Sequence, residues 1–449
     1  MKDGNFLTEN NARHMWHPMA HPADSAANPP IVVTEASGVR IADVEGHEAI
    51  DAVGGLWNVN LGYSCEPVKA AIRDQLDALP YYSTFRGTTN DAVIELSWRL
   101  SRFFEPDGLT RAFFTSGGSD SVETALKLAR QYHRLRGEAG RTKFISLKGG
   151  YHGTHFGGAS VNGNAKFRQA YEPLLPGCFH VPGPYLWRNP FGAETAENLA
   201  AHCLKALEAE IAFQGPDTVA AFIMEPVLGA GGVHVPHESF MPGVREICDR
   251  HGVLLIADEV ITAFGRTGDP TGSRHWGVRP DIACIAKAIT NGYFPFGAAM
   301  ISGKVAEVFE ADTTGKASVD TGYTYSGHPV GAAAAIACMD ETERLEPWKN
   351  ARVRGVQLLE GLHALADRFD AVGDVRGEGL MCAIELTADR EAKAPPSKEM
   401  PLAFQKAAYE AGALVRVSGP NAIFSPPLVV TEADVDTILS AAEAGLAAL

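Results

Sequence analysis

The chain has 449 residues, 45% of them hydrophobic and 21% charged, which is ordinary for a globular protein and long enough for more than one domain. Its formal net charge of −15 argues against a nucleic acid or an anionic membrane surface as a partner. No apolar run approaches the roughly 18 residues of a membrane-spanning helix, and the first residues lack the apolar stretch of a secretory signal.

The N-terminal part of the chain predicts an extended arm followed by a small antiparallel meander. Residues 1–30 are polar and rich in proline, which favours an arm with one short helix. Residues 31–55 alternate apolar and polar positions around turn signals at Ser37-Gly38 and Glu45-Gly46. This pattern is typical of short strands joined by tight turns.

The middle of the chain alternates between expected helices and expected strands. Apolar residues at helical spacing predict helices over 66–79 and 91–104 and a third that starts near Ser119. Short apolar runs predict strands over 111–114, 143–149, 217–224, 253–257 and 282–286. Strands that alternate with helices in this way indicate a mostly parallel sheet built of βα units.

The pattern changes after residue 330 and predicts a smaller α+β domain. Two long helical stretches come first, and a helix, two short strands and a last helix follow a charged, proline-rich loop at 388–400. The expected elements are helices at 330–346, 350–369, 400–411 and from Thr431 onward, and strands near 414–416 and 422–424.

Two neighbouring strand ends carry candidate chemistry. The run Val253–Ala257 ends on Asp258 and Glu259, and the run Ile282–Ala286 ends on Lys287. In an open α/β sheet, ligands bind outside the carboxyl ends of the strands, so an acid and a lysine there would face one crevice. Apolar neighbours lower the pKa of a lysine and make it a usable amine nucleophile. The alternative is a solvated strand-end lysine and an acidic pair that caps a helix.

Further polar or aromatic groups follow other strands. Ser116–Ser119 lies between a strand and a helix, where glycines and free N–H groups favour a phosphate, although a simple helix cap has the same composition. Tyr151 follows a strand and can stack on a planar cofactor or pack in the core. Glu225 ends another strand, and Arg416 lies within a short one.

The stretches ADEVITAFGRTG and PDIACIAKAITNGYFPFGAAMIS resemble the cofactor-binding core of the class III aminotransferases. These are pyridoxal 5′-phosphate enzymes of the α/β fold type I. The resemblance implies a large domain with a mostly parallel seven-stranded sheet and a smaller α+β domain. We expect residues 61–328 to form the large domain, 329–449 the small domain, and 1–60 a segment that contributes to the small one.

The resemblance also implies roles for the residues of the cofactor site. Lys287 would form the Schiff base and then act as general base and acid, and Asp258 would pair with the protonated pyridine nitrogen. Val260 and Tyr151 would cover the two faces of the ring. Gly118 and Ser119 would bind the phosphate, together with Thr324 of a neighbouring subunit. The other cofactor contacts that it implies are His152 and Glu225.

The substrate residues implied by the resemblance favour one subgroup. Trp57, Phe85 and Arg86 match positions that line the substrate entrance, next to Tyr151, and Arg416 would bind a carboxylate through a bidentate pair. Ala230 stands where aminotransferases for ornithine or 4-aminobutyrate carry a glutamate that holds this arginine away. The chain is therefore most similar to the ω-amino acid/amine:pyruvate subgroup, the ω-transaminases.

The sequence thus predicts an aminotransferase that moves an amino group from an ω-amino acid or primary amine to pyruvate by a ping-pong mechanism. The expected assembly is a homodimer or a dimer of dimers with shared active sites. Seven scattered cysteines without a CxxC motif indicate a reducing cytoplasm and neither a disulfide framework nor a metal site.

Several alternatives stay open at this stage. One is 2-oxoglutarate as the acceptor, and another is an aminomutase, racemase or decarboxylase on the same fold. A nucleotide-binding oxidoreductase would need a GxGxxG motif, which the sequence lacks. A cofactor-binding regulatory protein would need a DNA-binding module, and no basic segment is present.

Overall fold

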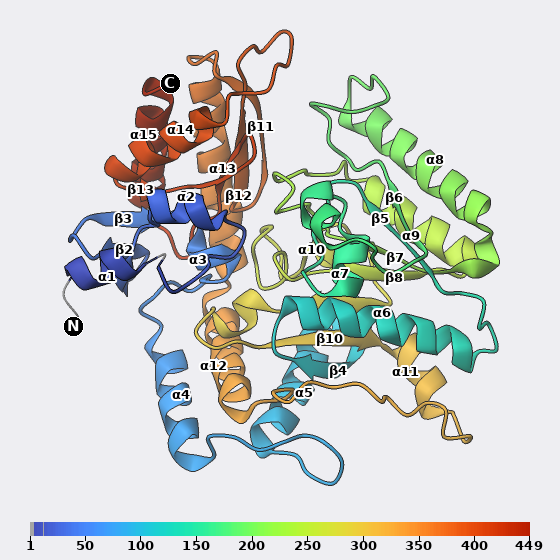
Figure 1. The fold of residues 1–449 in the computed structure, drawn as a ribbon. Helices are drawn as coiled ribbons and strands as arrows, with labels where there is room; N and C mark the ends of the chain where they lie inside the picture. The colour runs from blue at the N-terminus through green and yellow to red at the C-terminus, as the bar shows by residue number, and fades with distance from the viewer. Residues whose placement is uncertain (1–3, 12) are drawn as a thin grey trace.

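The computed structural model describes residues 4–11 and 13–449, whose strands form three sheets flanked by helices (Figure 1). The helices of the first half are α1 (Gly4–Asn10), α2 (Pro22–Ala27), α3 (Gly54–Trp57), α4 (Glu66–Ala78), α5 (Asp91–Phe103), α6 (Gly118–Leu135), α7 (Phe156–Val161) and α8 (Ala196–Gln214). Those of the second half are α9 (Phe240–His251), α10 (Gly272–His275), α11 (Gly303–Glu310), α12 (Pro329–Leu345), α13 (Pro347–Ala366), α14 (Glu399–Glu410) and α15 (Glu432–Ala447).

The largest sheet has seven strands in the order β4-β10-β9-β8-β7-β5-β6. Strand β10 is antiparallel to both neighbours, and the other neighbouring strands are parallel. This confirms the expected mostly parallel seven-stranded sheet. Its strands are β4 (Leu109–Thr115), β5 (Lys143–Leu147), β6 (Cys178–Val181), β7 (Val219–Met224), β8 (Leu254–Asp258), β9 (Ile282–Ile285) and β10 (Gly297–Ser302).

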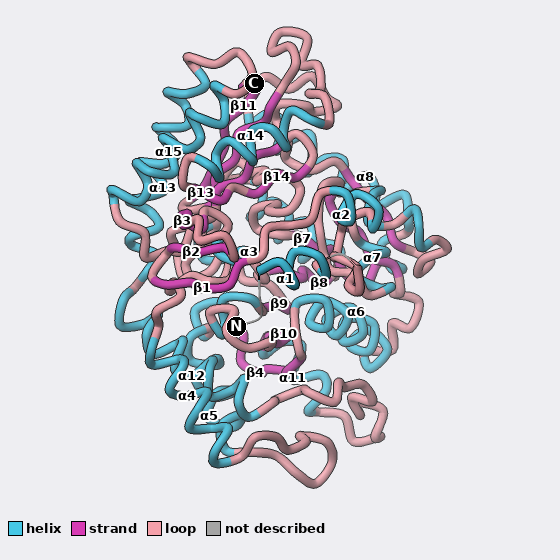
Figure 2. Tube along the Cα trace, turned by 60° about the vertical axis from the view of Figure 1, so that its left-hand side comes forward, coloured by secondary structure: helices cyan, strands magenta, loops and turns pink. Residues whose placement is uncertain are grey.

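Helices cover both faces of this sheet because its central strands are apolar on both sides. Ile282 and Cys284 pack toward α6 and α11, whereas Ala283 and Ile285 of the same strand pack toward α5 and α12. Helices α8 and α9 cover the second face further along the sheet. Figure 2 shows these strands between the two groups of helices. The three-layer arrangement follows from the continuous apolar runs.

The N-terminal strands join a strand from the far end of the sequence. Strands β1 (Val33–Ser37), β2 (Arg40–Asp43) and β3 (Glu48–Asp51) form an antiparallel meander, and β13 (Ala413–Leu414) pairs with β3 in parallel. In Figure 1 the blue N-terminal elements accordingly lie beside the red C-terminal helices. This pairing supports the expectation that residues 1–60 contribute to the small domain, while the domain limits stay a prediction.

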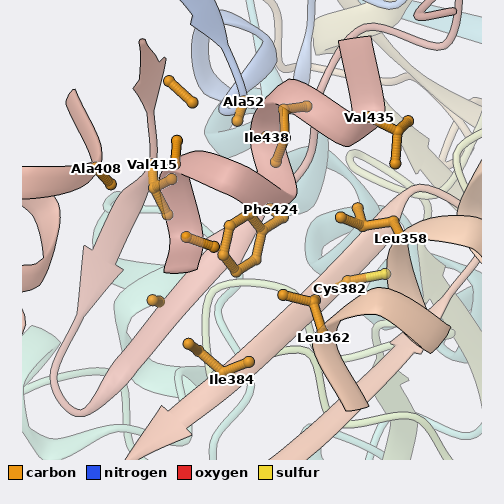
Figure 3. Packing of buried hydrophobic residues seen from close by; sticks show 14 of the residues in the cluster. Ala52, Leu358, Leu362, Cys382, Ile384, Ala408, Val415, Phe424, Val435 and Ile438 are labelled. Carbon is orange, nitrogen blue, oxygen red and sulfur yellow. The ribbon is translucent and has the colours of Figure 1, made fainter. Parts of the chain in front are cut away.

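The third sheet is antiparallel, in the order β11-β12-β15-β14, and carries the C-terminal core. Its strands are β11 (Val372–Glu378), β12 (Met381–Leu386), β14 (Arg416–Ser418) and β15 (Asn421–Phe424). Figure 3 shows Phe424 of this sheet packed between Leu362 of α13 and Ile438 of α15. Ala52, just after β3, belongs to the same buried cluster, so the N-terminal segment shares this core.

Within the described residues, no helix combines the length and apolar character needed to cross a membrane. The N-terminal arm contains two short helices, α1 and α2, where one was expected. The parallel strands β7, β8 and β9 end side by side, and the residues that follow or end them are Glu225, Asp258 and Lys287. The fold thus brings the predicted strand-end groups to one edge.

Candidate active site

A cavity of about 360 Å³ opens where these three strands end. Its lining includes the strand-end residues together with residues from the first turn of α6 and the loop after β5. The predicted cofactor residues that line it are Gly118, Ser119, Tyr151, His152, Glu225, Asp258, Val260 and Lys287. The structure therefore collects these residues, far apart in sequence, around one space.

Lys287 sits in a strained turn that directs it into this space. It begins a short 3₁₀ segment with φ +53°, and Asn291 ends that segment with φ +54°. The buried Asn291 accepts a hydrogen bond from the Leu61 N–H and donates one to the Gly62 carbonyl, both at 2.7 Å. These bonds fix the turn, since two residues with positive φ persist only where the surroundings hold them.

Burial lowers the pKa of Lys287, and the nearby carboxylates of Asp258 and Glu225 oppose this effect. Among the described residues, nothing accepts a hydrogen bond from its ammonium nitrogen. The desolvation expected from its apolar neighbours is therefore present. A lysine with a lowered pKa carries the neutral amine more readily and can act as a nucleophile or a base.

Asp258 is buried and pairs with a buried histidine. His152 donates from Nδ1 to Asp258 Oδ2 at 2.8 Å, and the Val260 N–H donates to Asp258 Oδ1 at 3.2 Å. The Nε2 atom of His152 is buried and has no partner among the described residues. The hydrogen bond from the histidine thus fixes the orientation of the Asp258 carboxylate in the cavity.

Glu225 is held by two backbone N–H groups at the cavity wall. Its two oxygens accept from Tyr151 and Gly229, each at 2.9 Å. Burial raises the pKa of Glu225 to about 7, with a further upward push from Asp258 and an opposing effect of His152. Near neutral pH this carboxyl group can therefore accept or donate a proton.

The start of α6 forms a cradle for an anion. The first N–H groups of a helix have no intrahelical acceptor, and the helix dipole favours negative charge there. A Cβ on Gly118 would lie 3.0 Å from Val260 Cγ1, and a Cβ on Gly153 would lie 2.6 Å from Ser119 Oγ. Glycine at these positions keeps the chain segments close and leaves the N–H groups accessible.

The neighbouring acid, Glu259, has a different task from Asp258. It is buried and accepts hydrogen bonds from the N–H groups of Gly272 at 2.9 Å and Ser273 at 2.6 Å, at the start of α10. The helix-capping alternative is thus correct for Glu259. The alternative of a solvated strand-end lysine is wrong for Lys287, because it lines the cavity and its neighbours Ala286, Ala288 and Ile289 are buried.

Arg416 and Ala230 lie close to the same site. Arg416 is half-buried at the start of β14, and burial lowers its pKa. Burial raises the pKa of Tyr151 and lowers that of Lys287, and the charge of Arg416 opposes the first shift and adds to the second. In the part of the chain that the structure describes, no carboxylate pairs with its guanidinium. Ala230 lies in a tight turn between Leu228 and His234, which form an isolated antiparallel β-bridge.

Other predicted substrate residues are not at the Lys287 cavity in a single chain. Phe85 and Arg86 line a separate cavity of about 800 Å³ with residues 319–322, and Arg86 lies 3.4 Å from Asp320. Thr324 is exposed. Trp57 is buried beneath the site, where it packs with the cavity residue Ile261.

The sequence profile of the family described as "Aminotransferase class-III" matches residues 22–446. The chain belongs to the class III aminotransferases. A solved structure of an amine transaminase from an uncultivated Pseudomonas species, in its PLP-bound form, is 47% identical, with a TM-score of 0.95 over 97% of this chain and 98% of that one.

Two curated relatives differ in the reactions that their names give. The omega-aminotransferase of Caulobacter vibrioides is 38% identical to this aminotransferase over 413 residues, 91% of this chain and 92% of the relative. The diaminobutyrate–2-oxoglutarate transaminase of Halomonas elongata is 36% identical over 445 residues, 97% of this chain and 95% of the relative.

Pyridoxal phosphate is the cofactor of this aminotransferase, and the cavity fits it chemically. A buried carboxylate at Asp258 suits a protonated pyridine nitrogen, a desolvated amine at Lys287 suits an aldehyde, and the start of α6 suits a phosphate. The three groups belong to one cavity wall, so one bound molecule can meet all of them.

Sequence reasoning missed several residues of the aminotransferase site. Asn58 and the segment 294–296 line the cavity without having been singled out. Asn291, which fixes the turn of Lys287, was also not predicted as a residue of the site. The signal that could have found it is the Asn-Gly pair after the lysine, because that dipeptide favours positive φ.

Proposed function

We propose that this class III aminotransferase transfers an amino group from a primary amine or an ω-amino acid to pyruvate. The observation that carries the proposal is the half-buried guanidinium of Arg416 beside Lys287, which has no carboxylate partner among the described residues. A desolvated cation without a partner favours an anionic ligand, and a keto acid supplies a carboxylate for a bidentate pair. Ala230 offers no acidic side chain that could occupy the arginine instead.

In the proposed reaction each residue has a defined task. Bound pyridoxal phosphate supplies the electron sink for the carbon that loses the amino group. Lys287 Nζ takes a proton from that carbon and delivers it to the cofactor, and burial favours the neutral amine that this task needs because it lowers the pKa of Lys287. Asp258 holds a proton on the ring nitrogen, and His152 fixes the orientation of that carboxylate. Arg416 binds the carboxylate of the keto acid.

The names of the relatives support an amine donor but do not decide between two acceptors. The names of the omega-aminotransferase and the amine transaminase give no acceptor, while the Halomonas relative is named for 2-oxoglutarate. Both acceptors carry the α-carboxylate that Arg416 would bind. A panel of amine donors, each combined with pyruvate and with 2-oxoglutarate, measures the preference directly. If the enzyme turns over neither with pyruvate nor with 2-oxoglutarate, the proposal is wrong.

The variant Arg416→Ala is expected to raise KM for pyruvate strongly. Loss of a charge-assisted bidentate contact costs roughly 1.5–3 kcal/mol, which corresponds to about 10- to 150-fold. The half-reaction with a simple amine should change little, because that donor has no carboxylate. Stopped-flow measurement of each half-reaction separates the two effects.

Arg352→Ala serves as the matched control, since it removes an exposed arginine that bonds the Gly268 carbonyl away from the cavity. Equal slowing of both half-reactions of Arg416→Ala would make Arg416 a structural residue. No change in either would place the carboxylate elsewhere, and Arg86 would be the next candidate to test.

We also propose that the enzyme works as a homodimer whose active sites are shared, in the cytoplasm. Thr324, Phe85 and Arg86 lie away from the Lys287 cavity in a single chain, although they match residues of the family's site. The helix α5 exposes two large apolar side chains, Ile94 at 56% and Trp98 at 63%. A second copy of the chain that covers this surface would explain both features.

Thr324→Ala is expected to weaken retention of the cofactor, because Thr324 would contact the phosphate bound at Ser119 of the neighbouring subunit. Cofactor loss and dimer dissociation should then be linked, so that dilution increases both together. Cofactor fluorescence and sedimentation velocity over a concentration series measure the two. Thr314→Ala, an exposed loop threonine, is the control. A fully active monomer would contradict the shared site.

A further inference from the structure

An arginine outside the cavity joins the two elements that carry the proposed specificity residues. Arg376 of β11 donates from Nε to the Gly232 carbonyl at 2.7 Å and from Nη2 to Asn421 Oδ1. Gly232 belongs to the turn of Ala230, and Asn421 begins the strand that pairs with the strand of Arg416. In the proposed function, Arg416 binds the substrate carboxylate and Ala230 leaves that arginine free to do so.

We propose that Arg376 is a positioning residue that sets the separation between Arg416 and the turn of Ala230. It would thereby determine how tightly the site binds a keto-acid carboxylate. The proposal rests on the proposed function, since it concerns the same carboxylate. Arg376 acts through its two neighbours and does not itself line the cavity.

The turn on one side needs support from outside. Val233 has φ +58°, which is unfavourable for a β-branched residue and persists only where the surroundings hold it. A Cβ on Gly232 would lie 2.8 Å from Asn421 Nδ2, so the turn lies directly against β15. At its other end the Gly229 N–H donates to Glu225 Oε2 in the cavity wall. A shift of the turn would therefore reach the active site.

The strand on the other side also depends on this contact. Strand β14 has three residues and lies at the edge of its sheet, where β15 is its only strand neighbour among the described residues. Asn421 pairs with Ser418 in register, and its Nδ2 donates to the Ser418 carbonyl at 3.2 Å. Arg376 thus holds, through Asn421, the hairpin in which Arg416 lies two residues from Ser418.

The guanidinium of Arg376 is fixed on its remaining sides. Its Nη1 donates to Asp374 Oδ2 at 2.7 Å and to Glu385 Oε2 at 3.2 Å, and its plane lies over the ring of Tyr185 at 5.2 Å. The side chain is 11% exposed. A planar group held by two carboxylates and a ring has one orientation, which a lysine cannot reproduce. The bridge to Gly232 and Asn421 is therefore rigid.

The test compares Arg376→Lys and Asn421→Ala with Asp374→Asn. The first two remove one or both arms of the bridge, and Asn421→Ala leaves the ion pairs of Arg376 in place. The control replaces the Asp374 carboxylate by an amide whose oxygen can still accept from Arg376 Nη1, so it removes the charge of one ion pair and keeps both arms. We expect the bridge variants to raise KM for pyruvate roughly 3- to 30-fold, which lies within the range of coupling between contacting residues. Maximal kcat and the half-reaction with a simple amine should stay near the wild-type values, and the control should leave KM unchanged.

A double variant distinguishes positioning from general damage. In the Arg416→Ala background, the bridge variants should raise KM for pyruvate no further, because their effect passes through Arg416. An effect that adds fully in that background, or equal slowing of both half-reactions, would overturn the proposal. If Arg376→Lys does not fold, Asn421→Ala carries the same comparison.

The two proposals fail in different ways. A wild type that accepts 2-oxoglutarate and not pyruvate refutes the pyruvate assignment, and the same comparison with 2-oxoglutarate still decides the role of Arg376. A strong effect of Arg416→Ala without any effect of the bridge variants refutes the positioning role and leaves the proposed function intact.

Discussion

Lys287→Ala is expected to abolish transamination and the covalent link between the protein and its cofactor. Proton transfer by a positioned group contributes roughly 10²–10⁴-fold to a rate, and the loss here includes the nucleophilic role as well. The purified wild type should be yellow and lose that colour on borohydride reduction, after which peptide mapping should find the label on Lys287. A label on another lysine would refute the assignment.

Lys148→Ala is the matched control for this variant. Lys148 also follows a parallel strand directly, β5, but it is exposed, so its removal should change neither colour nor rate. The pH dependence of stability gives a second test, in which the wild type and Lys287→Ala are compared without cofactor. Burial lowers the pKa of Lys287 below its unfolded value, so the unfolded state binds more protons just below that value and wild-type stability should rise with pH there. Denaturant titrations of Lys287→Ala should lack this rise.

The two strand-end lysines show how far the sequence carries a prediction of the site. The apolar runs before Lys148 and Lys287 are alike in length, and the strand-end rule alone does not separate them. What separates them is burial, which depends on the cover that the loop after β5 and the residues 294–296 give the cavity. The local pattern could not decide between Lys148 and Lys287. The resemblance of the stretch around Lys287 to the class III aminotransferases decided it.

The fold was predictable where hydrophobic runs were long and flanked by helices. The sequence analysis missed β6, which has four residues of mixed polarity, and β10, the antiparallel strand of the large sheet. Gly297–Ser302 is rich in glycine and alanine, which have low strand propensity. It is a strand because β4 and β9 on its two sides bond to it, a tertiary effect that no local pattern contains.

Residues that act across long sequence distances were the hardest to predict. Arg376 bonds a carbonyl 144 positions away, and the Leu61 N–H bonds Asn291 across 230 positions. Arg376 lies in an ordinary local context, and the Asn-Gly pair at Asn291 indicates a turn but not the segment that it bonds. Composition and periodicity therefore gave no signal for either long-range contact. The roles of Thr324 and Phe85 stay predictions for a different reason, since they require a second copy of the chain.

Asp258→Asn is expected to keep the fold and bind the cofactor but to lose most activity. An amide at this position still accepts a hydrogen bond from His152 Nδ1, which now bonds Asp258 at 2.8 Å. It carries no charge, so it cannot hold a proton on the ring nitrogen, and negative charge on the reacting carbon loses its stabilisation. Loss of one preorganised electrostatic partner costs about 3–4 kcal/mol, or roughly 10²- to 10³-fold in kcat.

The control is Asp281→Asn, a second buried acid of the same sheet. Asp281 precedes β9 at the opposite end from the cavity and accepts from Arg245, Lys304 and the Leu255 N–H. Its neutralisation should lower the free energy of unfolding, because Lys304 loses the carboxylate it pairs with and Arg245 loses one of its two, and should leave kcat unchanged. Single-turnover rates at saturating amine, with a denaturant titration of each variant, separate the effects. A near-normal rate for Asp258→Asn would show that the ring proton is held in another way, whereas a large loss confined to this variant assigns the charge of Asp258 to the chemical step.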